Sequence, residues 1–402
     1  MNITEIEDTT LSGLFSSSRI EISKSALQSN LSFLRKVIGK NVIICSVVKG
    51  NAYGHGMEQF VPLAETCGVR WFAVYSADEA LRVFNSSTAG SSIMIMGGMS
   101  RDQVEWAIEH GITFYVFDLN ELTFAIESAR KVGKRAQVHL EIETGMNRLG
   151  FGETALEQAA ELIKYNNELV DVVGVCTHFA GAESVANHLR IQHQIQTFET
   201  RLEWLFGLGI EPRLRHAASS AATFSYPYTR YDMVRVGIAQ YGFWPSIETR
   251  MQYVLQQQAN GGKQLARDPL TRVLRWKSHV INVKDVRAGE FIGYGTSFLT
   301  TRPSRVAAVP VGYYHGFNRN LSNVGHVLVR GKRVPVAGVV NMNLMLVDVT
   351  DVRHVENGDE VVLIGKQGRS EITVGAFSDL TKLLNYEALV RLSPDIARTV
   401  VP

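Results

Sequence analysis

The stretch VIICSVVKGNAYGHG, residues 42–56, indicates the fold more clearly than any other part of the chain. Its first seven residues are apolar or small without strict alternation, which is typical of a strand buried on both faces of a parallel sheet. Lys49 follows directly. Because burying an ammonium is costly, we expect Lys49 at the carboxyl end of the strand, pointing into the mouth of a barrel. The alternative is a strand-end lysine whose ammonium reaches solvent.

Seven similar runs follow, and longer amphipathic stretches separate most of them. Three of these stretches, 101–111, 119–133 and 187–209, end in glycine, a common signal at the end of a helix. Eight strand-helix units of this size are typical of a (β/α)8 TIM barrel, with an open doubly wound sheet as the alternative. The eight strands are predicted at 42–49, 71–76, 92–98, 113–118, 136–144, 172–179, 214–220 and 233–242.

Beyond the barrel the pattern changes. The Gln-rich segment 246–269 is expected to be a linker or surface insertion. From residue 270 alternating strands predominate, including one near 290–295, a hairpin tip at 330–332 and one helix near 376–392. This pattern predicts a mainly antiparallel β domain. We expect an N-terminal extension at 1–18, the barrel at 19–260 and the C-terminal β domain at 265–402.

The composition argues against several classes of protein. The chain has 402 residues, and its 41 Lys and Arg against 39 Asp and Glu give a net charge of +2, so no nucleic-acid partner is expected. Its three cysteines, Cys45, Cys67 and Cys176, are too widely spaced for a disulfide framework or a metal knuckle, and they suit a reducing compartment. No signal peptide or long apolar run is apparent, so we expect a cytoplasmic protein without a membrane partner.

The string KGNAYGHG, residues 49–56, resembles the pyridoxal-phosphate lysine motif of the alanine racemases. Further motifs recur in that family's order from about Arg19 to Arg398, and the family's fold is the predicted one. The resemblance implies that pyridoxal 5′-phosphate (PLP) is the cofactor, linked covalently to Lys49, with Tyr53 contacting its phosphate. It also implies an amino-acid racemase that converts L-alanine to D-alanine, and a homodimer.

The segment MVRVGIAQYG, residues 233–242, resembles another motif of the family. The resemblance places Arg235 on the pyridine nitrogen of the cofactor. Since a guanidinium only donates, it would leave that nitrogen unprotonated and the cofactor a weaker electron sink. Taken alone, Arg235 would more often be part of an ordinary salt bridge. The resemblance also assigns phosphate contacts to Gly237, Ile238 and Ser220, where Ser220 alone would read as a helix N-cap.

The string THFAGAE, residues 177–183, resembles the family segment that supports the site, with His178 behind Arg235. A lone histidine on an apolar strand is more often a core residue. A metal site built from His139, His178 and His216 is a further alternative, but the spacing does not favour it, and no metal is predicted.

The segment GEFIGYGTSF, residues 289–298, resembles the family's catalytic tyrosine segment. By this resemblance Tyr294 is the second base, contributed by the partner subunit, and each site of the homodimer is shared. Racemisation needs proton removal on one face of Cα and return on the other, which Lys49 and Tyr294 could perform. Because a phenol has a reference pKa near 10, a polarising neighbour such as His178 would be needed. Alone, Tyr294 would be a half-buried strand residue.

The segment ETGMNRLGFG, residues 143–152, resembles the family motif whose arginine binds the substrate carboxylate and the cofactor O3′, here Arg148. The family's usual residue at position 141 is a carbamylated lysine, whereas this chain has Glu141. We expect the Glu141 carboxylate to brace Arg148 with the same charge. Met342 and Tyr313 are expected to bind the substrate.

Several residues depart from the family pattern. Asn343 stands for an aspartate, His315 for another, and Pro394 for a tyrosine that gates the entrance and touches the phosphate. Losing that tyrosine should widen the pocket, so a broad-spectrum racemase for larger side chains is one alternative. Others are another lysine-PLP barrel enzyme, such as a decarboxylase or dehydratase, and a non-catalytic PLP-binding protein.

Overall fold

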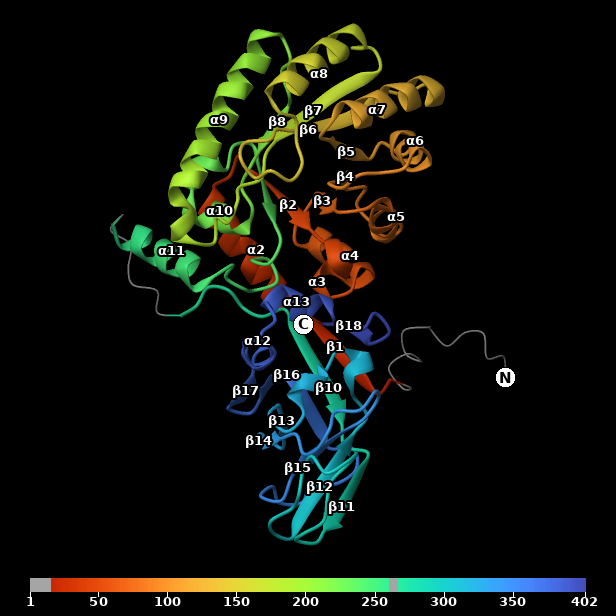
Figure 1. Ribbon diagram of the computed structural model, residues 1–402, viewed down its shortest axis with the longest axis vertical. Coiled ribbons are helices and arrows are strands. Elements are labelled where there is room, and N and C mark those ends of the chain that lie inside the picture. Colours follow the sequence, from red (N-terminus) through yellow and green to blue (C-terminus); the bar gives the residue numbers. More distant parts are fainter. Residues whose placement is uncertain (1–15, 260–266) are drawn as a thin grey trace. The chain divides into compact units, whose positions relative to one another are not determined.

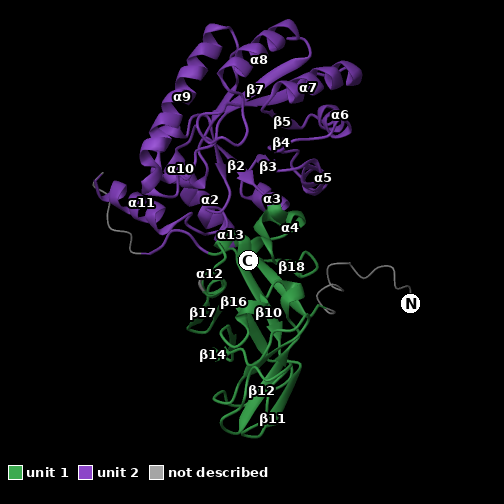
Figure 2. Cartoon of the chain, viewed as in Figure 1, with its two compact units in different colours: residues 1–24, 50–60, 272–402 green, residues 25–49, 61–271 purple. Residues whose placement is uncertain are grey.

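The computed structural model describes residues 16–259 and 267–402 (Figure 1). The chain divides into two compact units (Figure 2). The barrel unit comprises residues 25–49 and 61–271. The β unit comprises residues up to 24, residues 50–60 and residues 272–402.

Eight parallel strands form the core of the barrel unit and pair in the order β8-β7-β6-β5-β4-β3-β2-β9. The two ends of this sheet meet at a bridge between Ser219 and Arg235, where the Arg235 N–H donates to the Ala218 carbonyl at 2.9 Å, so the barrel is nearly closed. Each strand overlaps one predicted run, which confirms the (β/α)8 prediction. The strands are β2 (Ile43–Val47), β3 (Trp71–Val74), β4 (Ser92–Ile95), β5 (Thr113–Val116), β6 (Ala136–Glu141), β7 (Val170–Cys176), β8 (Leu214–His216) and β9 (Met233–Val236).

Helices α5 to α9 flank the outside of the barrel strands (Figure 1). Their ends follow local signals: Asp118 accepts the Glu121 N–H at the start of α7, and Gly133 ends α7 with φ 74°. Three of them match the predicted helical stretches. The helices from α2 to α10 are α2 (Lys24–Ile38), α3 (Lys49–Tyr53), α4 (Met57–Thr66), α5 (Ala77–Ser86), α6 (Arg101–Glu109), α7 (Leu119–Val132), α8 (Glu153–Tyr165), α9 (His188–Gly207) and α10 (Ser220–Ser225).

Part of the segment 246–269, expected to be a linker or surface insertion, is helical. Residues Ile247–Ala259 form helix α11, while 260–266 lie outside the described residues. The Gln-rich composition that suggested a linker is also favourable to a helix, since Gln, Met, Leu, Glu and Arg have good helix propensity. Thr249 and Tyr253, one turn apart, are buried and anchor the helix.

The β unit holds a larger sheet in the order β14-β13-β16-β10-β1-β18, with β17 on β16, and a three-stranded sheet β11-β12-β15. All pairs are antiparallel except β1 with β18, which confirms a mainly antiparallel domain. Its elements are β1 (Ser18–Ser23), β10 (Leu274–His279), β11 (Asn282–Val286), β12 (Ser304–Val309), β13 (His326–Val329), β14 (Lys332–Pro335), β15 (Met345–Asp348), β16 (Glu360–Gln367), β17 (Ser370–Ile372), α12 (Val374–Thr381), α13 (Asn385–Val390) and β18 (Ala397–Val401).

The division into units differs from the expected boundaries at the N-terminal side. Strand β1 pairs with β10 and β18, so residues 19–23 belong with the β unit and not with the barrel. The reason is burial, because Ile20 and Ile22 are completely buried in this position. Residues 50–60 also belong with the β unit, although they follow the first barrel strand.

Two further expectations for the β unit need correction. The helix expected at 376–392 is two helices, α12 and α13, because Lys382 adopts φ 59° and ends the first. The strand expected near 290–295 is a loop with one bridge, Phe291 to Leu299. Gly293 and Gly295, at φ 73° and 68°, interrupt the pleat that a strand requires.

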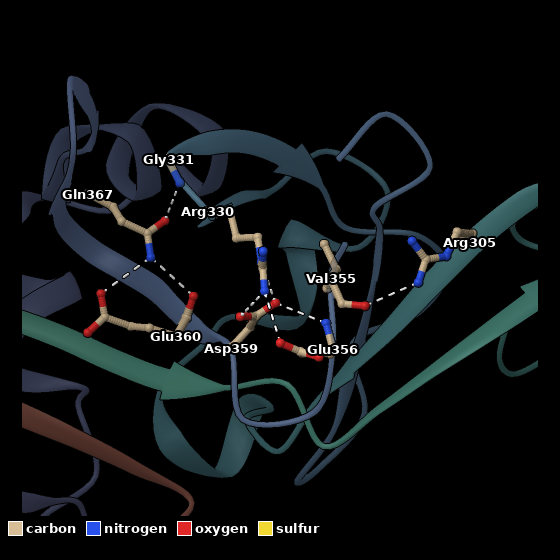
Figure 3. A network of polar contacts seen from close by, with 8 residues as sticks. All are labelled: Arg305, Arg330, Gly331, Val355, Glu356, Asp359, Glu360 and Gln367. Carbon is tan, nitrogen blue, oxygen red and sulfur yellow. Dashed lines mark hydrogen bonds and ion pairs between the residues drawn. The ribbon is translucent and has the colours of Figure 1, made fainter. Parts of the chain in front are cut away.

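The hairpin tip predicted at 330–332 is confirmed (Figure 3). Arg330 and Gly331 form the turn with φ of 49° and 74°, as a two-residue hairpin turn requires. The Arg330 guanidinium contacts the Asp359 carboxylate at 2.7 and 3.0 Å, and the Gly331 N–H donates to Gln367 at 2.7 Å. These contacts tie the tip to β16.

Candidate active site

Lys49 lies two residues beyond the end of β2, where the Val48 N–H still donates to the Ala73 carbonyl at 2.9 Å. The expected position of Lys49 at the carboxyl end of the first barrel strand is therefore confirmed. Its side chain is exposed in the single chain. The surrounding protein nevertheless lowers the Lys49 pKa by desolvation, and the positive charges of Arg148 and Arg235 lower it further against the opposing charge of Glu79. A lysine with a lowered pKa is a better nucleophile near neutrality.

The backbone after Lys49 forms a left-handed turn. Gly50, Asn51 and Ala52 have φ between 53° and 63° and ψ between 46° and 49°, and Tyr53 has φ 53°. Each non-glycine residue in this conformation costs about 1–2 kcal/mol. The turn is held by the Gly54 N–H on the Gly50 carbonyl at 3.0 Å and by the Asn51 side chain, which accepts the Met57 N–H at 3.1 Å. Such strain concentrates at functional sites.

The glycines of this segment let other parts of the β unit approach closely. A Cβ on Gly54 would lie 2.0 Å from the Leu389 carbonyl oxygen, and one on Gly56 would lie 2.3 Å from the Arg398 side chain. Arg398 itself donates to the Gly54 carbonyl at 3.0 and 3.2 Å. Glycine is therefore required here for packing against the C-terminal segment.

Arg235, at 5% exposure, is the most firmly held polar residue of the barrel mouth. One of its Nη groups donates to the His216 carbonyl and Nδ1 at 2.8 and 2.7 Å. The other donates to the Thr177 and Ala217 carbonyls at 2.8 and 3.1 Å and lies 3.4 Å from His178 Nδ1. Within the described residues the Nε–H has no acceptor, so one donor is left for a ligand.

The histidines behind Arg235 form a chain with a defined proton arrangement. Because arginine has no acceptor, His216 Nδ1 must accept, and its proton lies on Nε2. His216 Nε2 is 2.9 Å from His139 Nδ1 and donates to it. Desolvation first, and then the Arg235 charge, lowers the pKa of His139 to about 3 and that of His216 well below its usual value. His216 uses both of its nitrogens and His139 uses Nδ1, while the buried Nε2 of His139 has no partner among the described residues. No group of three or more side chains that could hold a metal ion is found among the described residues.

His178 is also neutral. Desolvation lowers its pKa to about 3, and the charges of Arg235, Arg148 and Lys49 act in the same direction. Since its Nδ1 faces the Arg235 guanidinium, its proton lies on Nε2, which can donate to a further group.

These histidines predict acid destabilisation of the fold. His55, His139 and His178 each have a folded-state pKa of about 3, mainly from desolvation, against an ordinary value of 6.5. Between these values the unfolded chain binds more protons, so the stabilisation present above pH 6.5 is lost as the pH falls, at up to about 1.4 kcal/mol per pH unit for each group. We expect the Tm from calorimetry to fall steadily from pH 6.5 to 4.5. A Tm that stays flat over this interval would contradict the neutral-histidine arrangement.

Ser220 lies beside the backbone that follows β9, and the phosphate contacts expected of these residues stay predictions. The Gly237 N–H donates to Ser220 Oγ at 3.0 Å, and the Ala239 N–H lies 3.4 Å from the same oxygen. Ser220, Gly237 and Ile238 are all buried. The Ser220 oxygen accepts from these N–H groups, and its own O–H can donate to an anion such as phosphate.

Arg148 lies on the exposed loop between β6 and α8, and its charge acts on both Lys49 and His178. The expected bracing of Arg148 by Glu141 stays a prediction: among the described residues the two side chains form no ion pair within 4.0 Å, although the Arg148 charge acts on Glu141. Glu141 is buried at the end of β6, whereas Arg148 is exposed. Burial raises the Glu141 pKa, while the Arg235 charge and then that of Arg148 oppose this effect.

The remaining predicted residues lie in the β unit. Tyr53 is buried beside Tyr386, with ring centroids 6.0 Å apart. Tyr294 is 74% exposed and Met342 is 56% exposed. Tyr313, Asn343 and Pro394 are exposed as well, so their expected contacts with substrate and cofactor stay predictions. The chain thus combines a (β/α)8 barrel with a barrel mouth that holds a lysine of lowered pKa, a buried arginine fixed by hydrogen bonds, and the contact of Ser220 with the Gly237 backbone.

Comparison with known proteins narrows this class. Residues 22–245 match the model of the alanine racemase N-terminal domain, and residues 273–400 match that of the C-terminal domain. The alanine racemase of Leptospira interrogans serovar copenhageni is 38% identical over 387 residues, 96% of each chain. Alanine racemase 1 of Caldanaerobacter subterraneus is 34% identical over 380 residues, 94% of each chain. The crystal structure of alanine racemase from Bacillus anthracis with bound L-Ala-P has a TM-score of 0.86 at 29% identity, covering 96% of both chains.

The chain belongs to the alanine racemase family and is an amino-acid racemase. Sequence reasoning missed the His216–His139 chain that orients Arg235. Its signal was the string HAASSAA, residues 216–222, whose first residue ends β8 and accepts two hydrogen bonds from Arg235.

Proposed function

We propose that the chain interconverts L- and D-alanine with PLP as cofactor, by a two-base mechanism in a homodimer with shared sites. The observation that supports this most strongly is the donor arrangement of Arg235. Its Nη groups are occupied by the protein, and its Nε–H alone remains among the described residues. A single permanent donor suits the pyridine nitrogen and leaves it unprotonated.

The residues of the barrel mouth fit PLP. Lys49 supplies an amine of lowered pKa, and the Ser220 hydroxyl with the Gly237 and Ile238 backbone offers donors to the phosphate. When bound, PLP withdraws electron density from the substrate Cα and makes its hydrogen acidic. Arg235 would hold the pyridine nitrogen of the bound cofactor and keep this withdrawal moderate, which would favour proton exchange over decarboxylation.

Two bases on opposite faces of Cα give racemisation without turning the substrate over. Lys49 serves one face, and Tyr294 of the second subunit serves the other. A neutral His178 carries its proton on Nε2, so it can donate to the Tyr294 oxygen and stabilise the phenolate. The 74% exposure of Tyr294 in the single chain supports its place in a site completed by another copy.

The substrate carboxylate is assigned to Arg148 and to the Met342 backbone, and Tyr313 lines the entrance. Three residues differ from the family pattern: Asn343, His315 and Pro394. Because of these differences, amino acids with larger side chains are an alternative substrate class. The Pro394 carbonyl accepts from Arg398 at 2.9 Å, and Tyr314 donates to Asp395 at 2.5 Å, so this segment is firmly held.

One assay in D2O tests the proposed function. PLP-loaded protein is incubated with a mixture of L-alanine, L-serine, L-lysine, L-arginine and L-methionine, and chiral mass spectrometry reports the enantiomer and the α-deuterium of each. We expect D-alanine with deuterium at Cα to dominate. Larger D-amino acids in excess would support the broad-spectrum alternative, and no deuterium in any product would overturn racemisation.

The substitution Pro394→Tyr is expected to narrow the substrate range. The added ring fills space at the entrance, so kcat/KM for the larger amino acids should fall about tenfold relative to alanine. The same mixture and mass spectrometry measure the ratio, with Pro394→Ala as the matched control that leaves the space open. An unchanged ratio in Pro394→Tyr would mean that residue 394 does not set substrate range.

A further inference from the structure

Glu143 makes an unusual set of contacts in the loop between β6 and α8. Its Oε1 accepts the N–H groups of Gly145 and Met146, the latter at 2.7 Å. Its Oε2 accepts those of Asn147 at 2.8 Å and Arg148 at 3.4 Å. Burial alone would raise the Glu143 pKa, but these four backbone donors outweigh it and lower the pKa below its usual value. The Glu143 carboxylate therefore accepts hydrogen bonds from the backbone of four successive residues.

The loop depends on these side-chain hydrogen bonds because its backbone is irregular. Gly145, Asn147 and Gly150 have φ of 124°, 57° and 117°, so no regular hydrogen-bond ladder can form along it. At its base the Phe151 N–H donates to the Glu141 carbonyl at 2.8 Å, and the Glu143 N–H donates to the Phe151 carbonyl at 3.1 Å. Between these two contacts, hydrogen bonds to the Glu143 carboxylate replace those that regular secondary structure would provide.

Helix α9 holds the same loop from outside. Arg190 donates to the Gly145 carbonyl at 2.7 Å, and Gln194 donates to the Thr144 hydroxyl at 3.1 Å. Arg201 donates to the Glu143 carbonyl. The loop is thus fixed from its interior and from α9, and the residue that it presents is Arg148.

We propose that Glu143 is a positioning residue, which presets the Arg148 backbone so that its guanidinium meets the substrate carboxylate. This inference rests on the proposed function. A preset arginine binds substrate without a cost of ordering the loop, so Glu143 acts on substrate binding through Arg148. A carboxylate that merely capped a surface loop would affect stability alone.

The chain offers a matched control in Glu65. Its carboxylate also accepts four hydrogen bonds in a loop, from the hydroxyls of Ser87, Thr88 and Ser91 and the Thr88 N–H, at 2.6 to 2.8 Å. This loop precedes β4, at the amino ends of the barrel strands, whereas Lys49 and Arg148 follow strands. Glu65→Gln therefore disrupts a comparable cap away from the site.

The experiment compares Glu143→Gln, Glu143→Asp and Glu65→Gln with wild type as full-length PLP-loaded protein. We expect Glu143→Gln to raise the KM for alanine about tenfold with little change in kcat, because the amide NH2 replaces an acceptor by a donor facing backbone N–H groups. Glu143→Asp keeps the charge and should recover most of the loss. Glu65→Gln should lower the Tm and leave KM unchanged.

Two measurements besides activity decide the remaining outcomes. Hydrogen exchange at 145–148 should speed up in Glu143→Gln and not in Glu65→Gln. Faster hydrogen exchange in Glu143→Gln with an unchanged KM would show that Glu143 stabilises the loop without positioning Arg148. Unchanged hydrogen exchange would show that the Glu143 carboxylate does not hold the loop. Either result overturns the inference. If wild-type protein racemised no amino acid, the proposed function would fail, but the inference on Glu143 could still be tested by PLP titration. Weaker PLP binding in Glu143→Gln, but not in Glu65→Gln, would support a positioning role. Equal PLP binding by wild type and Glu143→Gln would overturn it.

Discussion

Replacing Lys49 by alanine is expected to reduce racemisation by about 10⁴-fold or more, because one side chain then fails both as the cofactor's covalent partner and as a base. The lysine is prepared for this role by its place directly after β2 and by desolvation and the charges of Arg148 and Arg235, which lower its pKa. The measurement is the formation of D-alanine by chiral mass spectrometry, together with the visible absorbance of the PLP-loaded protein.

Lys49→Arg is the control for charge. It keeps the positive group at the barrel mouth but cannot form a Schiff base, so it should be as inactive as the alanine variant and should lack the visible band. A Lys49→Ala protein that retained activity within tenfold of wild type would show that another residue holds the cofactor.

Replacing Tyr294 by phenylalanine is expected to reduce racemisation by about 10² to 10⁴-fold, the usual contribution of a general base. The more specific expectation concerns exchange in D2O. With one base removed, Lys49 can still exchange the α-hydrogen of one enantiomer, whereas the other enantiomer gains no deuterium. Mass spectrometry of separate L- and D-alanine reactions measures both.

The control for Tyr294→Phe is Tyr165→Phe, which removes the hydroxyl of a tyrosine that is 89% exposed at the end of α8. It should leave both rates unchanged. Equal loss of exchange from the two enantiomers in Tyr294→Phe would argue against one base per face and would remove Tyr294 from the proposed mechanism.

The barrel could be predicted from the sequence because buried parallel strands leave a strong signal. Each of the eight apolar runs became a strand, since a strand covered on both faces needs continuous apolar residues. The boundary between the units could not be predicted, because β1 joins partners more than 250 residues away, as the pairing of Ile20 with Trp276 shows. Such long-range pairing has no local signature.

Residues with an unusual backbone conformation could not be predicted from the sequence either. Lys382 divides the last helical stretch by adopting φ 59°, a conformation rarely expected of lysine. The left-handed turn after Lys49 includes Ala52 and Tyr53, residues that normally avoid it. In both cases tertiary packing overrides the local preference.

The roles of the candidate site residues stay predictions, but some of the contacts among these residues can be compared with the sequence. The resemblance located Arg235, Ser220 and His178, and the structure brings Arg235 to His178 and Ser220 to the Gly237 backbone. Glu141 and Arg148 form no direct ion pair among the described residues, although the Arg148 charge acts on Glu141. Side-chain networks of this kind depend on distances that a motif does not carry.

The central claim, two bases contributed by two copies of the chain, can be tested by mixing two inactive variants. Lys49→Ala and Tyr294→Phe proteins are mixed in equal amounts, allowed to exchange subunits, and assayed for D-alanine. A mixed dimer holds one site with Lys49 of one copy and Tyr294 of the other, so random exchange should restore about one quarter of the wild-type activity. If the mixture is no more active than the two variants alone, although mixed dimers are detected by native mass spectrometry, the shared two-base site is contradicted.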